Sequence, residues 1–341
     1  MNISKLTILT SVLALGILAS CGKDGCTDPT APNYNPDATK DDGSCEEVAN
    51  EYLLTGTLSE NKTLDASHIW TLEGRVIVPS GVTLTIPAGT IIKATAGTGA
   101  NASSLVIARG GMINAEGTAS APIIMTSTSD DIAVGQTSGS SLTENVRGLW
   151  GGLLVLGNAP CSFSGDVSEL QIEGIPASET NGLYGGSDPA DNSGVLRYVS
   201  IRHGGAEIGE GNEINGLTLG GVGTGTTIEN IEVVGNVDDG IEFFGGTVNA
   251  SGLLVWGQGD DGLDIDQAYA GTISNSMVIL NEASDHALEI DGPEGSAPGR
   301  FTLDGITLIG TNDECDPTGV DGEIADYRKV APEMSEALTN N

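Results

Sequence analysis

Two short apolar runs separated by a polar turn form a unit that recurs along the second half of the chain. The turn is rich in Gly and Asp, and the second run begins at Ile241, Leu263 and Leu288, at steps of 22 and 25 residues. The three copies are Ile231–Val234 with Ile241–Phe243, Leu253–Trp256 with Leu263–Ile265, and Met277–Leu280 with Leu288–Ile290. Two short strands and a step of this length predict an all-β fold, a right-handed parallel β-helix with one unit per coil.

Apolar and polar side chains alternate inside the second run of each copy. Because successive residues of a strand point to opposite faces, one set points into the coil and the other points out of it. Stacked coils place equivalent inward residues in two columns, namely Ile241, Leu263 and Leu288, and Phe243, Ile265 and Ile290. The acidic residues between these columns are predicted to stand on an exposed outer face: Glu242, Asp264 and Glu289.

The chain before these copies follows the same scheme less regularly. Apolar alternation predicts further strands at Val76–Val78, Val82–Ile86, Leu105–Ile107, Ile123–Met125, Tyr198–Ile201 and Leu217–Leu219. The nearly all-apolar run Gly148–Gly157 predicts buried strands, and residues 158–194 are expected to form a long polar excursion. Trp150 and Trp256 lie in strand patterns and are predicted to be buried. With 50 glycines and 4% aromatic residues, the composition favours a β-helix over residues 50–341 rather than helices.

The first twenty residues have the pattern of an export signal. Lys5 is the only charged residue there, and the apolar stretch Leu6–Leu18 is too short for a bilayer span, which needs about 20 residues. The stretch ends in Leu18-Ala19-Ser20-Cys21, which resembles the lipobox of bacterial lipoproteins. This resemblance implies cleavage of a 1–20 signal peptide, lipid attachment to Cys21, and a membrane anchor. Because Lys23 replaces the Asp of inner-membrane retention signals, we expect the outer membrane and the cell surface; the alternative is an ordinary signal peptide.

Residues 21–49 are expected to form a lipidated linker with a small cysteine-bracketed motif. In an oxidising compartment Cys26 and Cys45 should form a disulfide, which stabilises such a loop by about 3 kcal/mol. The motif resembles a short cysteine-bracketed repeat of extracellular bacterial proteins and, more loosely, the Asp-rich calcium repeats of thrombospondin. Its candidate Ca²⁺ ligands are Asp37, Asp41 and Asp42, because hard cations prefer clustered oxygen atoms. The alternative is a solvated spacer held by the disulfide.

Two further cysteines remain after the lipidated residue and the linker pair. A bond between Cys161 and Cys315 would complete an even count. The β-helix pattern places several coils between them, and coils stack about 4.8 Å apart. That separation exceeds the reach of a disulfide unless loops fold back.

The net charge of -34 at pH 7 narrows the range of partners. Such a surface repels nucleic acids and anionic lipid headgroups, so divalent cations are the expected ligands and no organic cofactor is implied. If the coils stack, carboxylates at equivalent positions lie about 4.8 Å apart and repel one another. Ca²⁺ is therefore expected on this ladder, with hydration and salt screening as the alternative. Its candidate ligands are Asp238, Asp260, Asp264 and Asp285.

Several segments resemble a family of uncharacterised bacterial cell-surface lipoproteins with a pectin-lyase-like β-helix. They are Arg147–Gly152, Ser200–Gly205, Gly235–Gly240 and Gly259–Gly262. The likeness covers about residues 50 to 325 and implies the β-helix fold, but it implies no particular reaction. Members of this family run longer, so the chain is expected to stop before the last coils, with a short helical cap at Pro332–Asn341 as the alternative.

Catalytic chemistry has weak candidates in Arg202, His203, Asp260 and Asp261. Hydrolases on this type of fold use clustered Asp residues with Gly-His-Gly and Arg-x-Lys motifs, and neither motif occurs in this sequence. Lyases on the fold often use a basic residue beside Ca²⁺, for which Arg202 and His203 are the candidates. The sequence favours a non-catalytic protein that binds an extracellular glycan or serves as an adhesive spacer. The alternative is a polysaccharide lyase or glycoside hydrolase on the same fold.

Overall fold

The structure is a computed structural model that describes residues 22–29, 31, 33–45, 51–207 and 214–310. The chain divides into two compact units, residues Met1–Glu51 and Tyr52–Asn341. Cys21, Cys315 and Pro332–Asn341, on which the predictions of lipidation, a second disulfide and a helical cap rest, lie outside the described residues. No helix within the described ranges is long and apolar enough to cross a membrane.

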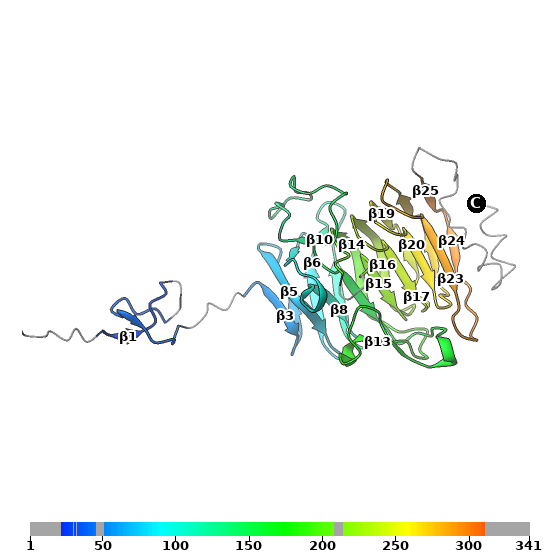
Figure 1. The fold of residues 1–341 in the computed structure, drawn as a ribbon. Helices are drawn as coiled ribbons and strands as arrows, with labels where there is room; N and C mark the ends of the chain where they lie inside the picture. Colours follow the sequence, from blue (N-terminus) through cyan, green and yellow to red (C-terminus); the bar gives the residue numbers. More distant parts are fainter. Residues whose placement is uncertain (1–21, 30, 32, 46–50, 208–213, 311–341) are drawn as a thin grey trace, which may run out of the picture. The chain divides into compact units, whose positions relative to one another are not determined.

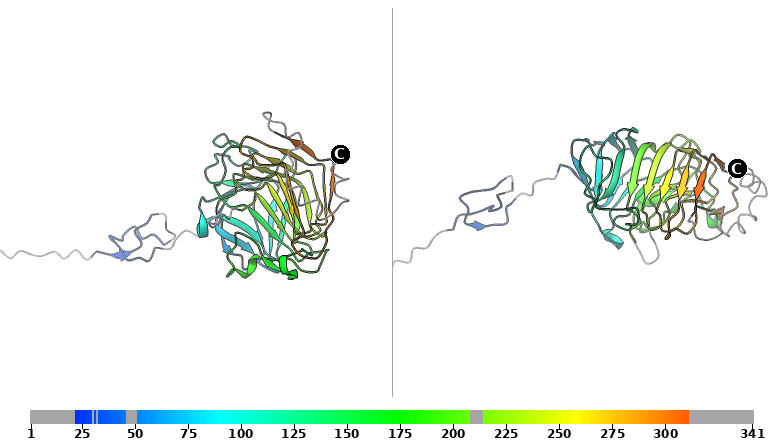
Figure 2. Two further views of the ribbon diagram at one scale, coloured as in Figure 1. Left: turned by 45° about the vertical axis from the view of Figure 1, so that its right-hand side comes forward. Right: turned by 90° about the horizontal axis from the view of Figure 1, so that it is seen from above.

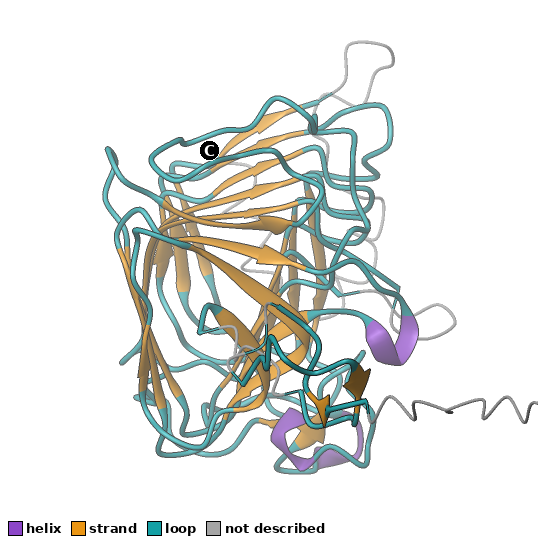
Figure 3. Cartoon of the chain, turned by 90° about the vertical axis from the view of Figure 1, so that its left-hand side faces the viewer, coloured by secondary structure: helices purple, strands orange, loops and turns teal. Residues whose placement is uncertain are grey.

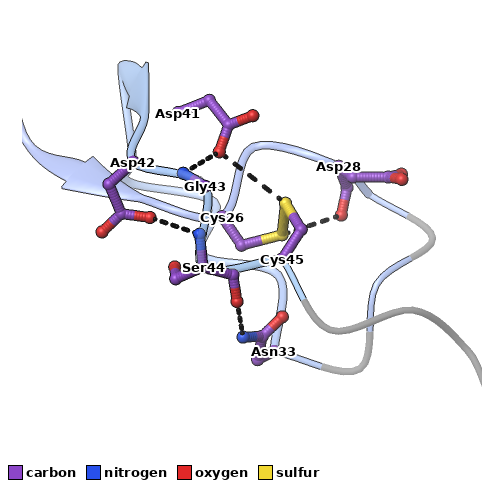
Figure 4. Close-up of a disulfide and its surroundings, with 8 residues drawn as sticks. All are labelled: Cys26, Asp28, Asn33, Asp41, Asp42, Gly43, Ser44 and Cys45. Atoms are coloured by element: carbon purple, nitrogen blue, oxygen red, sulfur yellow. Dashed lines mark hydrogen bonds between the residues drawn. A yellow bond between two sulfur atoms is a disulfide. The ribbon is translucent and has the colours of Figure 1, made fainter.

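The first unit contains one short parallel strand pair and the predicted disulfide. Strands β1 (Asp24–Gly25) and β2 (Lys40–Asp41) pair in parallel. The disulfide joins Cys26 to Cys45, and Cys26 is almost completely buried. Figure 4 shows the bridge with the turn of Asp41–Ser44 beside it. In a unit this small, a closed loop replaces much of the stabilisation that a larger apolar core would supply.

The second unit is a right-handed parallel β-helix whose coils each cross three sheets (Figure 1). Sheet I contains the first part of β3 (Leu53–Thr57) and β5 (Ile69–Val78), then β7 (Ile91–Ala94), β10 (Ile123–Ser127), the last part of β14 (Gly194–Arg202) and β16 (Thr227–Val234), β19 (Leu254–Trp256), β22 (Met277–Ile279) and β25 (Thr307–Ile309). Sheet II contains the end of β3 and β5, then β8 (Ser104–Ile107), β11 (Leu153–Leu156), β15 (Leu217–Gly220), β17 (Ile241–Phe244), β20 (Leu263–Asp266) and β23 (Leu288–Gly292). Sheet III contains β4 (Lys62–Thr63), β6 (Thr83–Pro87), β9 (Met112–Glu116), the first part of β14 and β16, β18 (Ala250–Ser251), β21 (Thr272–Ser274) and β24 (Thr302–Asp304).

All pairings among these 21 strands are parallel, and Figure 2 shows the strands of successive coils side by side along the unit. The prediction of two strands per coil is therefore incomplete, because each coil crosses three sheets. The third strand is short in the later coils, as in Ala250–Ser251. A strand of two or three residues has a single inward side chain, so it leaves no apolar run in the sequence.

The inward columns predicted from the repeat are confirmed. Ile241, Leu263 and Leu288 are register partners in sheet II, and so are Phe243, Ile265 and Ile290. All six side chains belong to one core cluster that extends from Leu54 in β3 to Ile290 in β23. Because each coil contacts mainly its two neighbours, stability is distributed along the stack rather than concentrated at one centre.

The corner between sheet III and sheet I is formed by one residue in the left-handed region of backbone conformation. Tyr198, Asn230, Gly252, Asn275 and Gly305 occupy this position in five successive coils, with φ between 49° and 69°. Gly and Asn adopt this conformation at the lowest free-energy cost among the natural residues. Their recurrence at one register position sets the angle at which the chain leaves sheet III.

A long excursion after β11 covers the outer face of sheet II. It contains the antiparallel pair β12 (Leu170–Gln171) and β13 (Leu183–Tyr184), and two of the short 3-10 turns, η2 (Ser164–Asp166) and η3 (Thr180–Gly182); η1 (Gly99–Asn101) lies before β8. These helical turns are purple in Figure 3. We call residues 158–192 the covering layer, because its apolar side chains pack on sheet II in a second core cluster: Phe163, Ile172, Ile175 and Tyr184 against Ile77, Val106, Leu154, Leu156 and Phe244.

The two tryptophans predicted to be buried differ in their exposure to solvent. Trp150 is buried and its indole Nε1 donates a 2.7 Å hydrogen bond to the Arg202 carbonyl oxygen. The prediction for Trp256 is wrong, since 38% of this residue is exposed. In the three-residue strand β19 only Val255 points into the coil, and Trp256 stands at an outward position beside Ile279.

Candidate functional site

Three acidic residues stack at the corner between sheet I and sheet II, as the repeat predicts. Asp238, Asp260 and Asp285 line an open cavity of about 410 Å³. The backbone N–H of Asp285 donates a 3.0 Å hydrogen bond to the carbonyl oxygen of Asp260, which fixes the two coils in register here. Burial and the neighbouring Asp285 raise the pKa of Asp260 above its usual value. The cavity is therefore strongly acidic and open to solvent.

In the first two of these turns the next residue, Asp239 or Asp261, is also acidic but is buried, and in the third turn it is His286. Asp239 Oδ1 accepts a 3.0 Å hydrogen bond from the backbone N–H of Asp261, and Asp261 Oδ1 accepts one of 2.7 Å from the N–H of His286. Each carboxylate thus caps the backbone of the following coil. This structural role accounts for one oxygen atom of each of these two carboxylates.

Behind this ladder lies a compact group of three buried carboxylates: Asp239, Glu242 and Asp264. Their ligand oxygens all lie within 4.8 Å of one another. Glu242 and Asp264 are register partners on the outer face of sheet II, and a hydrogen bond joins their carboxyl groups. The side-chain amide of Asn215 donates a hydrogen bond to Glu242 Oε2. We call these four residues the buried acidic group.

Part of the predicted ladder is not exposed, contrary to expectation. Glu242 and Asp264 point out of the coil as the alternation predicts, but only 6% and 8% of these residues remain exposed. Sequence reasoning missed the apolar side of the covering layer, whose residues are too far apart in sequence to form a run. Glu289 is half-buried at the next position of the same column.

Burial raises the pKa of several of these carboxyl groups toward or above neutral pH. It raises the pKa of Asp261 to about 6, of Asp264 to about 7 and of Asp266 to about 8. For Glu289 the hydrogen bond with Asp261 comes first and burial second, and together they raise the pKa to about 9. The pKa of Glu242 is also well above its ordinary value because of burial and the charge of Asp264. Such groups can act as proton donors or hold a cation.

The catalytic candidates fall into two separate sets. Arg202 donates a 2.6 Å hydrogen bond to Ser200 Oγ and forms a 3.1 Å ion pair with Glu232 on sheet I. His203 is buried, its Nδ1 lies 2.7 Å from the carbonyl oxygen of Val146, and burial lowers its pKa. Within the described ranges, no hydrogen bond or ion pair links these two residues to Asp260 or Asp261.

The candidate calcium ligands of the first unit have other partners. Asp37 forms a 2.8 Å ion pair with Lys23. Asp41 and Asp42 accept hydrogen bonds from the backbone N–H groups of Gly43 and Ser44, each at 3.0 Å (Figure 4). The carboxylates of Asp41 and Asp42 thus support the local backbone of the motif, and that of Asp37 holds the Lys23 side chain.

A second cavity lies over the outer face of sheet III. Its volume is about 450 Å³, and most of its lining side chains are hydroxyl or amide groups: Thr226, Thr227, Ile228, Glu229, Asn249, Ala250, Ser251, Thr272 and Ser274. Register partners in the cavity, such as Ser251 and Ser274, place polar groups at the coil spacing. We call it the sheet III groove. Sequence reasoning missed it because it missed the third strand of the coil.

Sheet I ends in an exposed apolar patch. Trp256, Met277 and Ile309 are 38%, 36% and 43% exposed and come from the last three strands of this sheet. In this part of the chain sheet I therefore offers apolar surface, whereas sheet III offers polar surface.

Residues 56–321 match the model of the pectate-lyase-like β-helix domain family, and the chain belongs to that family. The match begins in β3 and spans every strand of the three-sheet unit that follows. No curated protein and no solved structure shows significant similarity to this chain. The family confirms the predicted β-helix; the lipoprotein resemblance stays a prediction.

Proposed function

We propose that this protein is a lipid-anchored protein of the outer-membrane surface that binds an extended glycan without cleaving it. The observation that carries the proposal is the sheet III groove. Its hydroxyl and amide groups repeat from coil to coil at about 4.8 Å, and such groups both donate and accept the hydrogen bonds that sugar hydroxyls require. A straight row of this kind suits a linear polymer better than a compact ligand.

The charge of the chain favours a neutral glycan. A net charge of -34 repels uronic acids and sulfated sugars over the whole surface. In the groove, the negative charge of Glu229 is balanced by Arg197 through a 2.8 Å ion pair, so the local surface is polar rather than strongly charged. Exposed Trp256 on sheet I could contribute a stacking surface for a sugar ring at a second contact.

A carbohydrate-active enzyme is the second candidate function. It is favoured by carboxyl groups whose pKa values reach about 6 to 9, the range of a general acid at neutral pH. Against it stand the burial of Asp264 and Glu242 and the separate positions of Arg202 and Asp260. A substrate chain would have to displace the covering layer to reach the buried carboxyl groups.

Binding should depend on the groove and should not be accompanied by cleavage. Replacing two lining residues together, Thr272→Val with Ser274→Ala, removes two hydroxyl groups and should weaken glycan binding by a factor of about 5 to 150, since a net hydrogen bond contributes about 0.5–1.5 kcal/mol. The full-length protein would be titrated calorimetrically with neutral linear polysaccharides. The matched control is Thr307→Val, an exposed threonine of sheet I, which should leave the affinity unchanged.

The same polysaccharides, and acidic ones, would be assayed for new reducing ends and unsaturated products. We expect none. Turnover that disappears in Arg202→Ala or Asp260→Ala would overturn the binding proposal in favour of the lyase or hydrolase. Equal affinity of the groove variant and the wild type would also reject the groove as the binding surface.

Anchoring should depend on a single sulfur atom. Cys21→Ser removes the thiol that the lipobox resemblance assigns to lipid attachment. We expect complete loss of labelling by a fatty-acid analogue and release of the protein from the membrane fraction, because no other segment of the sequence predicts an anchor. The Cys26→Ser variant serves as the control and should still be labelled. Persistent labelling of Cys21→Ser contradicts the lipoprotein assignment.

A further inference from the structure

The buried acidic group brings three carboxyl groups together inside the protein. Asp239 and Glu242 come from one coil and Asp264 from the next. Within the described residues, none of the three carboxylates forms an ion pair with Lys, Arg or His. Carboxylates this close inside a protein must share protons or a cation, because their mutual repulsion is screened far less than on the surface.

Two buried oxygen atoms of the same group have no hydrogen-bond partner among the described residues. One is Oδ1 of Asp264, and the other is Oδ1 of Asn215. Only 1% of the residue Asn215 is exposed. The Asn215 amide nitrogen donates to Glu242, so the carbonyl oxygen on the same carbon atom lies beside the carboxylates as well. Buried polar atoms are nearly always satisfied, and an unsatisfied pair in one place indicates a missing partner. Both atoms are oxygens, so that partner is a cation or a hydrogen-bond donor.

We propose that the buried acidic group binds one Ca²⁺ ion with ligands from three successive coils. The ligands are carboxylate oxygens of Asp239, Glu242 and Asp264 and the carbonyl oxygen of Asn215. Ca²⁺ takes six to eight oxygen ligands at about 2.3–2.6 Å, so two of its ligands lie at most about 5 Å apart. The 4.8 Å limit on the carboxylate oxygens meets this condition. Second carboxylate oxygens and water complete the shell.

The donor set distinguishes Ca²⁺ from other divalent ions. It contains neither His nor Cys, which are the ligands that zinc and copper prefer. Mg²⁺ demands a compact octahedron at about 2.1 Å and keeps several waters, which suits a site closed by an apolar layer less well. A large, hard cation with irregular coordination fits the arrangement best.

The ion can reach this site through the open acidic cavity. Asp239 also belongs to a second group of ligand oxygens within 4.8 Å of one another, formed with Asp238 and Asp260. Those two residues line the solvent-exposed cavity at the corner. The exposed carboxylates attract the ion and Asp239 passes it inward. The ladder expected to hold Ca²⁺ at the surface thus becomes the approach to a buried site.

Calorimetric titration of the chelator-washed full-length protein with CaCl₂ tests the proposal directly. We expect one ion per chain and a midpoint of thermal unfolding that rises by roughly 5 °C or more in 1 mM Ca²⁺ relative to chelator at matched ionic strength. Asp264→Asn and Glu242→Gln should each abolish binding. In chelator, Asp264→Asn should unfold at a higher temperature than the wild type, because it removes repulsion; in Ca²⁺ the order should reverse.

Two controls separate this site from other acidic residues. Asp304→Asn lies at the end of β24 in sheet III, and Asp41→Asn with Asp42→Asn lies in the cysteine-bracketed motif. Both should bind Ca²⁺ as the wild type does. No binding heat and an unchanged midpoint in the wild type would overturn the proposal. So would Ca²⁺ binding that survives both Asp264→Asn and Glu242→Gln, or that is lost in the Asp41 and Asp42 variant. Wild-type binding is measured first, so the proposal can be rejected without any variant. If one variant does not fold, the other variants still test whether Ca²⁺ binds at this site.

Discussion

In the presence of chelator, the β-helix should lose stability as the pH rises from about 4 to about 8. Burial raises the pKa of Asp264 from 3.8 to about 7 and that of Asp266 to about 8. Below pH 4 these groups are protonated in both the folded and the unfolded chain. Above pH 4 the unfolded chain releases its protons while the folded chain retains them, so the free energy of unfolding falls until the pH passes the folded pKa. At about 1.4 kcal/mol per pKa unit, Asp264 alone accounts for about 4 kcal/mol.

Urea unfolding in chelator between pH 4.5 and 8.5 measures this dependence. Asp264→Asn should make the profile less steep, because the amide does not titrate, whereas the exposed Asp304→Asn should leave its slope unchanged. Stability that stays constant or rises over this range in the wild type would contradict the raised pKa values. Added Ca²⁺ should reverse the trend if the ion binds the ionised group.

Phe243→Ala should destabilise the protein by about 3–5 kcal/mol, the usual cost of truncating a buried aromatic residue. Phe243 is fully buried, pairs in register with Leu219 below and Ile265 above, and its ring centroid lies 4.8 Å from that of Tyr269. The cavity would therefore open at the contact between three coils. Because each coil relies on its neighbours, the loss should also lower the cooperativity of unfolding.

The matched control is Trp256→Ala, which removes a larger side chain from an outward position with 38% exposure. We expect it to cost less than half as much as Phe243→Ala, since part of the indole already contacts water. Denaturant unfolding of both variants compares the two costs. A loss for Trp256→Ala equal to that for Phe243→Ala would contradict the assignment of inward and outward positions.

The repeat in the sequence was sufficient to predict the stacking of the coils. In a parallel stack each residue pairs with its equivalent one repeat later, so steps of 22 and 25 residues translate directly into register. Ile241, Leu263 and Leu288 are partners for this reason. The same logic placed Asp238, Asp260 and Asp285 together at one corner. The grouping of side chains that occupy equivalent repeat positions could therefore be predicted without a structure.

The third sheet could not be predicted from the sequence in this way. Ala250–Ser251 and Thr272–Ser274 each contribute one inward side chain, and their strand conformation is stabilised by pairing with the coils on either side rather than by a local pattern. The sheet III groove depends on these strands, so it too appeared only when the coils were stacked. The exposure of Trp256 has the same origin, because a three-residue strand has too few positions to show which face is buried.

The sequence by itself determined the β-helix, its register and the columns of apolar and acidic side chains, because these follow from a periodic pattern read one repeat at a time. The tertiary structure alone decided which acidic column is buried. Phe163 and Tyr184, far from Glu242 and Asp264 in the sequence, bring the covering layer onto sheet II. Burial of this column depends on side chains that lie outside the repeat, and their contacts produce no periodic pattern in the sequence. Because of that packing, Glu242 and Asp264 are buried rather than exposed, and their pKa values are raised.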